Sequence, residues 1–331
     1  MSAERSPGLL KRIRYRGEWL IVGALAVLLP LLPRQILHAI ADLFGALAAY
    51  VYVPGRRVAL TNLATVFPKR PEGERRLLVR QSYQYFARAQ AELFWASRLT
   101  RGNVHEIYDL SALEQLPRDR SYIFGCLHYG GFESIAIVLG FCDFNCTVVT
   151  QAFKNGLLDG TFNRLREVSG HQTIRREGAL LRLFKALQNG RSVVLATDLT
   201  IPAKLPSVPV RCFGMLTSMT FAHAFLHKRT GAPIIPTYCQ PLPDGRYRLV
   251  VQEPLVFGSE ATHQEIAQAC WDSLEPVVRQ NPAPWLWMYK HWRYRPASEA
   301  HGYPDYANES YWFEKLLART AKEKTALATT R

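Results

Sequence analysis

The stretch YIFGCLHYGGFE, residues 122–133, carries the strongest structural signal in the chain. Residues 122–127 form a short apolar run typical of a buried strand, and residues 132–139 have the composition of a helix. In open α/β sheets ligands bind at the carboxyl ends of strands, which is where His128 and the two glycines fall. The glycines let a substrate approach the backbone closely. This order predicts a strand, a functional turn and a helix.

The same alternation continues towards the C-terminus. We expect strands at 146–150, 192–196, 233–238 and 247–252, and helices at 160–168, 178–188 and 218–228. Strands that alternate with helices favour a sheet covered on both faces. The sequence therefore predicts an α/β fold with a central mixed, largely parallel sheet flanked by helices.

The composition narrows the choice of partners. The chain has 41 lysines and arginines against 27 acidic residues, a net charge of +14, which usually accompanies an anionic partner. We do not expect nucleic acid, because the chain has no zinc-finger spacing and no aromatic RNA-binding signature. The six cysteines lie mostly in apolar, strand-like segments without metal-ligand spacing. They indicate free thiols, a reducing compartment and no metal site.

The N-terminal region is apolar with basic flanks. The run at 19–32 has no charge, but its 14 residues fall short of the roughly 20 that a spanning helix needs. A second run at 36–53 is interrupted by His38 and Asp42. This pattern favours a membrane-anchoring helix that lies in the interface or re-enters it. A cleaved signal peptide and an ordinary buried helix remain as alternatives.

His128 and Glu133 are the candidates for chemistry. Five residues apart on one helix, they would point about 140° away from each other. They can meet only if His128 lies in the turn before the helix and Glu133 in its first turn. A carboxylate on one ring nitrogen would fix the tautomer and leave the other nitrogen as a base. The alternative is a structural histidine beside a glutamate that stabilises the helix N-terminus.

Further motifs, in a fixed order along most of the chain, carry a family resemblance. They are Arg56-Arg57, Asn62-Leu63, Phe67-Pro68, Glu74-Arg75, Arg176-Glu177-Gly178, ALQNG at 186–190, Asp198, Phe213-Gly214, Thr217, TGA at 230–232, Pro236, Asp244-Gly245, PWLW at 284–287 and Arg293. With HYGGFE as a His-x4-acid motif, this set resembles the bacterial lipid A late acyltransferase family (lauroyl and myristoyl transferases) of the lysophospholipid acyltransferase superfamily. The resemblance runs from about residue 10 to about residue 296.

The resemblance implies an acyltransferase that moves a fatty acyl group from a thioester to a lipid hydroxyl. His128 would deprotonate the hydroxyl, and Glu133 would orient His128 and stabilise its charged form. The implied donor is acyl carrier protein, or else acyl-CoA, and no cofactor is implied. The implied acceptor is a membrane glycolipid such as a lipid A precursor, at the cytoplasmic face of the bacterial inner membrane.

Three domains follow from this reading: an N-terminal membrane anchor at 1–55, an acyltransferase domain at 56–298 and a helical tail at 299–331. Three other functions remain open. They are transfer to another lipid (an ornithine lysolipid, a phosphoinositol mannoside or a lysophospholipid), hydrolysis of the thioester, and a non-catalytic lipid- or carrier-binding module. The intact His128 and Glu133 argue against a binding module, which has no need of a base.

The substrate-binding candidates are Arg176, Arg164, Asp198, Tyr129, Gly130 and Arg211. Arg176 matches a basic family position that faces the active site, and its planar fork suits a phosphate. For Arg176 and Arg164 the alternative is a solvated surface arginine. Asp198 precedes Leu199 where the family has a polar residue, so a substrate role and a turn-forming role both remain open. Arg211 and Cys212 replace the family's apolar aromatic pair, so the acceptor can differ from the usual lipid A precursor.

Overall fold

The computed structural model describes residues 8–299 and 301–329, so residues 1–7 of the predicted anchor and residues 300 and 330–331 of the predicted tail lie outside the described residues. The helices are α1 (Leu9–Leu28), α2 (Arg34–Val51), α3 (Val53–Val66), α4 (Glu72–Trp95), α5 (Val104–Ile107), α6 (Ile135–Phe141), α7 (Asp159–Arg166), α8 (Ala179–Gln188), α9 (Ala222–Thr230), α10 (His263–Gln280) and α11 (Tyr311–Thr329). The strands are β1 (Tyr108–Asp109), β2 (Ile123–Gly130), β3 (Cys146–Thr150), β4 (Gln172–Arg175), β5 (Ser192–Ala196), β6 (Ser207–Cys212), β7 (Met215–Thr220), β8 (Ile234–Pro241), β9 (Tyr247–Val251), β10 (Tyr294–Arg295) and β11 (Asn308–Glu309). Short 3-10 turns are η1 (Leu29–Leu31), η2 (Ala96–Arg98), η3 (Ser111–Leu113), η4 (Phe132–Ser134) and η5 (Glu167–Ser169).

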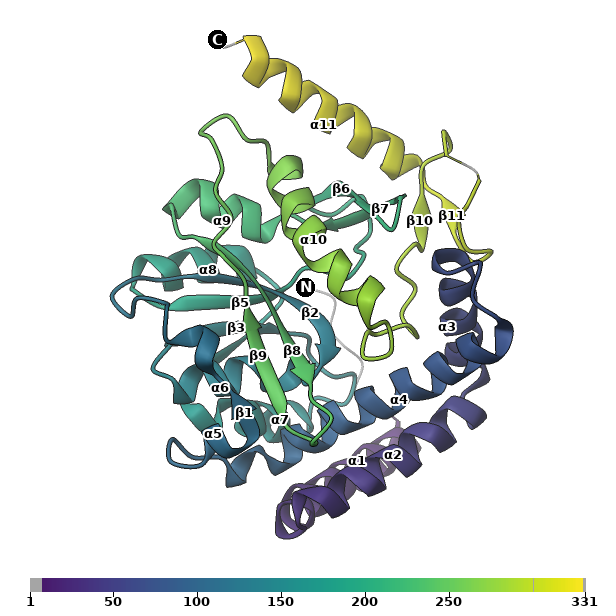
Figure 1. Cartoon of the computed structure of the whole chain (residues 1–331), viewed down its shortest axis with the longest axis vertical. Helices are drawn as coiled ribbons and strands as arrows, with labels where there is room; N and C mark the ends of the chain where they lie inside the picture. Colours follow the sequence, from purple (N-terminus) through teal and green to yellow (C-terminus); the bar gives the residue numbers. More distant parts are fainter. Residues whose placement is uncertain (1–7, 300, 330–331) are drawn as a thin grey trace.

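The central sheet has the strand order β1-β9-β8-β2-β5-β3-β4 (Figure 1). Neighbouring strands are parallel except β8 and β9, which are joined by a hairpin and run antiparallel. The prediction of a mixed, largely parallel sheet is therefore confirmed. Strand β2 lies near the middle, between β8 and β5, so the strand that carries His128 is paired on both edges.

Alternate residues of the central strands enter two hydrophobic clusters. Ile123 and Leu127 of β2 pack with α8, α9 and α10, whereas Phe124 and Cys126 pack with α4, α5, α6 and α7. Successive side chains of a strand point to opposite faces, so helices cover both faces of the sheet. This explains why the strands read as continuous apolar runs.

Several predicted boundaries differ from the structure. Strands β3 and β5 begin and end where expected, but β2 continues to Gly130 instead of ending at 127. The helix expected at 218–228 is wrong in its first residues, because residues 218–220 pair with β6 as the end of β7. Strands β4 and β6 were not anticipated. In each case pairing with a neighbouring strand satisfies backbone groups that local composition leaves undecided.

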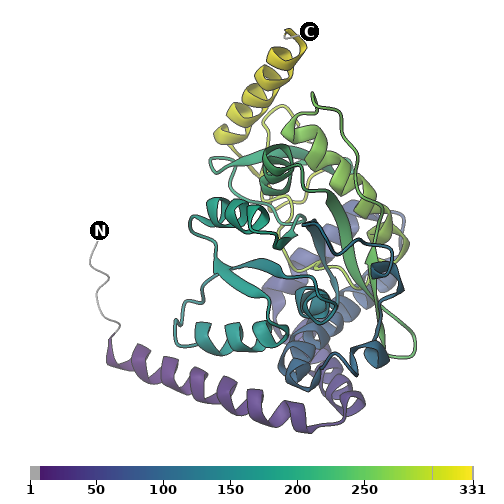
Figure 2. The same cartoon turned by 90° about the vertical axis from the view of Figure 1, so that its left-hand side faces the viewer.

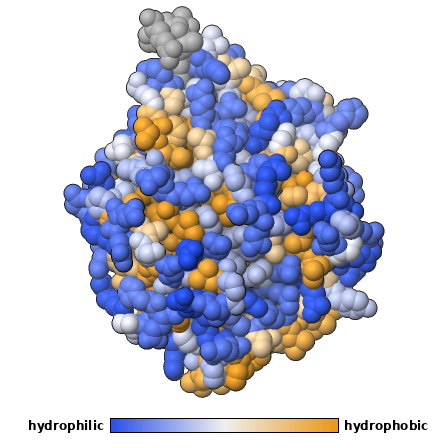
Figure 3. Space-filling model, in the orientation of Figure 1, coloured by the Kyte–Doolittle hydropathy of each residue, from blue (hydrophilic) through white to orange (hydrophobic). Residues whose placement is uncertain are grey.

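The N-terminal helices lie at one end of the molecule. Figure 2 shows α1 projecting beyond the sheet and its covering helices, and Figure 3 shows apolar residues at the lower edge, where α1 and α2 lie. No helix in the described part of the chain is by itself long and apolar enough to span a bilayer. Helices α2 and α3 taken together are long and apolar enough, but the pair is bent by 88° where the two helices meet.

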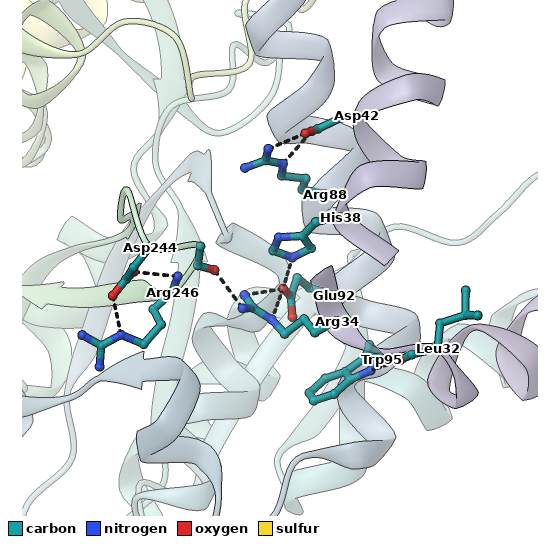
Figure 4. Close-up of polar contacts among 10 residues, drawn as sticks. Leu32, Arg34, His38, Asp42, Arg88, Glu92, Trp95, Asp244 and Arg246 are labelled. Atoms are coloured by element: carbon teal, nitrogen blue, oxygen red, sulfur yellow. Dashed lines mark hydrogen bonds and ion pairs between the residues drawn. The ribbon is translucent and has the colours of Figure 1, made fainter. Parts of the chain in front are cut away.

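A buried ion cluster fastens α2 to α4 (Figure 4). The carboxylate of Glu92, fully buried, accepts from the Arg34 guanidinium at 2.7 Å and contacts the His38 ring at 2.5 Å. Arg34 also donates to the Gly245 carbonyl in the β8–β9 hairpin at 2.8 Å. Burial would raise the pKa of Glu92, but His38 and Arg34 outweigh it and the pKa is lowered. The cluster therefore ties the N-terminal helices to the sheet.

Candidate active site

His128 lies inside strand β2 rather than in the turn after it. The β2–β8 pairing is irregular between Cys126 and Gly130, and this irregularity contains the histidine. The strand continues to Gly130, which pairs with Cys239 of β8, and the Gly131 N–H donates to the Cys239 carbonyl at 3.2 Å. The predicted placement of His128 in a turn is therefore wrong, although the residue does lie at the carboxyl end of the strand.

The carboxylate of Asp198, just after β5, holds His128. Its Oδ1 lies 2.8 Å from His128 Nδ1, and its Oδ2 accepts from the His128 backbone N–H at 2.8 Å. Oδ2 also accepts from the indole N–H of Trp285 at 2.9 Å. Asp198 is fully buried. These contacts fix the ring through Nδ1 and leave Nε2 without a partner among the described residues.

Glu133 does not bond the His128 ring, so its predicted orienting contact is replaced by that of Asp198. Glu133 sits in η4, where both its oxygens accept from Arg166 at 3.1 Å, and Gln90 of α4 donates to it at 3.4 Å. Because His128 lies within the strand, the turn that follows carries Glu133 away from the ring nitrogen. Asp198, in turn, is buried behind His128 and does not line the cavity that His128 faces, which corrects its predicted substrate-binding position.

The negative charges near His128 favour the protonated form of its ring. Burial would lower the pKa of its ring, but the charge and hydrogen bond of Asp198 outweigh burial, and Glu133 adds to them. The pKa of His128 is therefore raised above its usual 6.5. Burial would raise the pKa of Asp198, but its contacts with His128 lower it, so the carboxylate stays ionised. This combination stabilises the imidazolium that forms when a base accepts a proton.

His128 faces a cavity of about 770 Å³, within the usual size range for ligand pockets. The wall is mostly apolar and combines residues from both faces of the sheet: Phe132, Ile135, Ala136, Val148, Val149, Phe153, Ala179, Leu180, Leu183, Val194, Leu195, Leu205 and Ala222. Its polar lining includes Glu133, Arg166, His171 and Arg176. An apolar chain with a polar or anionic end fits such a cavity.

Of the remaining predicted binding residues, Arg176 lines the cavity and the others do not. Arg176 is exposed and lines the cavity, as expected. Arg164 is exposed on α7 outside the lining, and Arg211 on β6 pairs with Glu299 at 2.8 Å, so neither reaches the cavity. Tyr129 is buried on the other face of β2, where its hydroxyl donates to the Asn281 carbonyl.

Gly130 likewise serves packing. It has a φ of +54°, and a methyl group there would collide with the Cys239 carbonyl oxygen. Among the described residues that line the cavity, the predicted substrate-binding residues Arg164, Arg211, Tyr129 and Gly130 are therefore not found.

Sequence reasoning missed two residues of the site. Arg166 was overlooked in favour of Arg164, although a helical wheel through Phe162 and Leu165, both buried, places Arg166 on their side of α7 and Arg164 opposite. Trp285 appears in the sequence only as part of the PWLW motif; it is fully buried, and its bond to Asp198 has no local signal. It spans 87 residues of sequence.

Comparisons with known proteins identify a family and several relatives. A family model described as "Bacterial lipid A biosynthesis acyltransferase" matches residues 4–294. The chain is 25% identical over 296 residues to a phosphatidylinositol mannoside acyltransferase of Mycolicibacterium smegmatis, covering 86% of this chain and 92% of that protein. It is 24% identical over 299 residues to the lipid A biosynthesis myristoyltransferase of Escherichia coli, covering 88% and 91%.

A solved structure, the 1-acyl-sn-glycerophosphate acyltransferase of Thermotoga maritima, matches 76% of this chain and 99% of that chain at 17% identity, with a TM-score of 0.37.

A histidine held by a buried carboxylate beside an apolar cavity, on an α/β sheet, has the arrangement of a general base. The chain belongs to the bacterial lipid A biosynthesis acyltransferase family, and it is an acyltransferase.

Proposed function

We propose that this enzyme transfers a fatty acyl group from an acyl-carrier thioester to a hydroxyl of a membrane glycolipid such as a lipid A precursor. The observation that carries the proposal is the His128–Asp198 contact of 2.8 Å beside an apolar cavity. Asp198 holds the proton on Nδ1, so the Nε2 lone pair is available to a substrate hydroxyl.

In this mechanism His128 Nε2 removes the proton from the acceptor hydroxyl as its oxygen attacks the thioester carbonyl. The carbon–sulfur bond breaks, and the protonated His128 returns its proton to the departing thiolate. Asp198 stabilises the imidazolium between these two steps. No acyl-enzyme intermediate is required. The cavity holds the acyl chain and excludes water, which favours transfer over hydrolysis.

Glu133 and Arg166 take a supporting role in this proposal. Glu133 adds negative charge that raises the pKa of His128. It also holds Arg166 through two bonds of 3.1 Å, so the guanidinium has a defined position in the cavity wall. A guanidinium fixed in this way is the candidate to stabilise the oxyanion. Arg176 is left to attract an anionic group of the substrate.

The proposed donor is acyl carrier protein, with acyl-CoA as the alternative. Acyl carrier proteins are acidic, and the net charge of +14 would steer an acidic partner. The test is turnover with the same acyl chain on each carrier across a salt series, because salt screens such steering. Equal rates with acyl-CoA and no salt dependence would reject the carrier protein.

The proposed location is the cytoplasmic face of the bacterial inner membrane. On α1 an exposed apolar stripe faces away from the body, formed by Leu9, Leu10, Ile13, Leu20, Ile21, Val27 and Leu28. Basic residues Lys11, Arg12, Arg14 and Arg16 border the stripe, as expected for a helix lying on anionic lipid. The exposed Leu43, Phe44 and Leu47 extend the apolar surface over α2.

Vesicle co-sedimentation of a Leu20→Glu, Ile21→Glu double variant tests this location. We expect binding to anionic vesicles to fall at least tenfold, since two charges replace apolar side chains that the membrane would bury. Val256→Glu is the matched control, because Val256 is exposed on a loop after β9. Equal binding of the double variant and the control would reject α1 as the anchor.

The acceptor is the least constrained element. The two relatives described above are named for different lipids, and this chain is about equally similar to both, at 25% and 24% identity. Phosphatidylinositol mannoside is therefore the second candidate acceptor. Mass spectrometry of membrane lipids with and without the active protein would identify the lipid that gains an acyl chain. Free fatty acid without an acylated lipid would instead indicate a thioesterase.

A further inference from the structure

A second cavity, of about 550 Å³, lies between the start of α3 and the segment 288–293. We call it the basic pocket, because its lining contains three cations, Arg57, Lys290 and Arg293, and one carboxylate, Asp305. It shares no lining residue with the cavity that contains His128.

The three cations of the basic pocket have no carboxylate partner among the described residues. Lys290 lies over the Tyr306 ring at 5.3 Å, and the guanidinium groups of Arg57 and Arg293 make no ion pair. Elsewhere surface arginines are commonly paired, as Arg211 is with Glu299 and Arg248 with Asp109. Three cations and one carboxylate give this concave site a net positive charge, which indicates an anionic ligand.

The walls of the basic pocket are built on one fully buried side chain. Asn62 of α3 donates to the carbonyl oxygens of Trp287 and Tyr289, both at 2.8 Å, and accepts from the Tyr306 hydroxyl at 2.5 Å. These bonds join α3 to residues 287–289 and to Tyr306, which lies between β10 and β11. The pocket is therefore a preformed feature rather than a gap between mobile loops.

The basic pocket adjoins both the apolar N-terminal surface and the catalytic residues. Tyr52, exposed at the corner between α2 and α3, lines the pocket beside the exposed Tyr50 and Val51. On the other side, the Tyr289 hydroxyl donates to the Thr200 carbonyl at 2.7 Å, and His291 Nδ1 lies 3.2 Å from the Asp198 carbonyl.

Charged groups from both cavities act on Tyr289. Burial raises the pKa of its hydroxyl, and two cations oppose this effect: Arg293 from the basic pocket and Arg176 from the rim of the catalytic cavity. The Tyr289 hydroxyl therefore lies within reach of the charges of both cavities, with Asp198 acting on its pKa in the opposite sense to the two arginines.

We propose that the basic pocket binds a phosphate group on the head of the lipid acceptor. This assignment rests on the proposed function, since it supplies the anionic end of the same acceptor whose hydroxyl meets His128. A lipid phosphate lies just outside the apolar layer, and Tyr52 and Arg57 follow closely in the chain on the exposed apolar residues of α2, Leu43, Phe44 and Leu47. A single concave site suits one headgroup better than the broad acidic face of a carrier protein.

The test uses the full chain and one acceptor in two forms: a phosphorylated lipid A precursor, and the same lipid after phosphatase treatment. Arg57→Gln, Lys290→Gln and Arg293→Gln are each compared with Lys322→Gln, which removes an exposed charge from α11. We expect each pocket variant to lower the ratio of kcat/KM for the phosphorylated over the dephosphorylated acceptor about tenfold. The donor KM and the Lys322→Gln ratio should not change.

Three outcomes would overturn the proposal. An unchanged ratio of kcat/KM values for the two acceptors would show that the pocket does not bind the phosphate group. A rise in donor KM alone would assign the pocket to the carrier protein. An equal loss of kcat/KM with both acceptors would show that the pocket cations only attract the protein to the membrane surface.

A binding assay separates this proposal from the proposed function. His128→Ala protein is sedimented with phosphatidylcholine vesicles that contain either form of the lipid, with and without free inorganic phosphate. Preferential binding of the phosphorylated lipid, lost in Arg293→Gln, supports the pocket even if the enzyme acylates a different lipid. Competition by low concentrations of inorganic phosphate would instead assign the pocket to a free anion and overturn the lipid assignment.

Discussion

Replacing Asp198 by asparagine should disable the base while leaving the shape of the site intact. In the native site Oδ2 accepts two hydrogen bonds, from the His128 backbone N–H and from Trp285, and Oδ1 faces Nδ1. An amide has only one acceptor oxygen, and the two fixed donors claim it. The amide N–H group then faces Nδ1 and donates to it, which moves the ring proton to Nε2 and removes the base.

The expected loss is about 10²–10⁴ in kcat, the usual contribution of a positioned base, or about 3–5 kcal/mol in the barrier. A second effect gives the reasoning its sharpest test. Without the charge of Asp198, burial dominates and the pKa of His128 falls. The acid limb of residual kcat/KM should therefore move to lower pH, a shift that misfolding would not produce.

The assay is acyl transfer from a matched thioester between pH 5 and 9, with circular dichroism to confirm folding. Asp244→Asn is the control, because that carboxylate is exposed and pairs with Arg246 in the β8–β9 hairpin. Activity of the Asp198→Asn variant within about threefold of the native rate, well below the span expected for loss of a base, would refute the His128–Asp198 mechanism.

Three further predictions follow from the charged and buried groups. Glu133→Gln should shift the acid limb of kcat/KM to lower pH, but less than Asp198→Asn, since Glu133 is the weaker influence on the pKa of His128; a shift to higher pH would contradict this. Acid should destabilise the fold through three buried histidines with pKa values lowered to about 4: His171, His223 and His291. Their neutral forms are favoured by folding, so each contributes fully above about pH 6.5 and loses up to about 3 kcal/mol by pH 4, which urea unfolding at a series of pH values would measure. Glu92→Gln should cost about 3–5 kcal/mol in thermal or urea unfolding because Arg34 would stay buried without its partner, whereas Glu72→Gln on the surface of α4 should leave unfolding unchanged.

The sequence was most informative about the sheet. Strands β3 and β5 were located to the residue, because continuous apolar runs bounded by polar residues indicate strands buried on both faces. It was least informative where pairing decides conformation. The hairpin of β6 and β7 converts residues 218–220 from a predicted helix to a strand, because backbone bonds to a partner outweigh local preference.

The candidate site divides in the same way. Local pattern found His128, because a histidine after a buried strand falls at the carboxyl edge of the sheet. It chose the wrong carboxylate for the ring: Glu133 is near in sequence, whereas Asp198 is 70 residues away and reaches His128 because β2 and β5 are neighbours. Strand order cannot be read from the spacing of residues in the chain.

The sequence by itself determined the α/β class, the acyltransferase family, the candidate base and the apolar N-terminal helices, because each depends on composition, periodicity or motif order. Only the tertiary structure decided which carboxylate holds His128, which arginines reach the cavity, and that Arg57, Lys290 and Arg293 share a pocket. The residues that meet in these sites come from segments up to 236 residues apart, from Arg57 to Arg293. The sites arise when packing of the two faces of the sheet brings those segments together, and no local signal records that step.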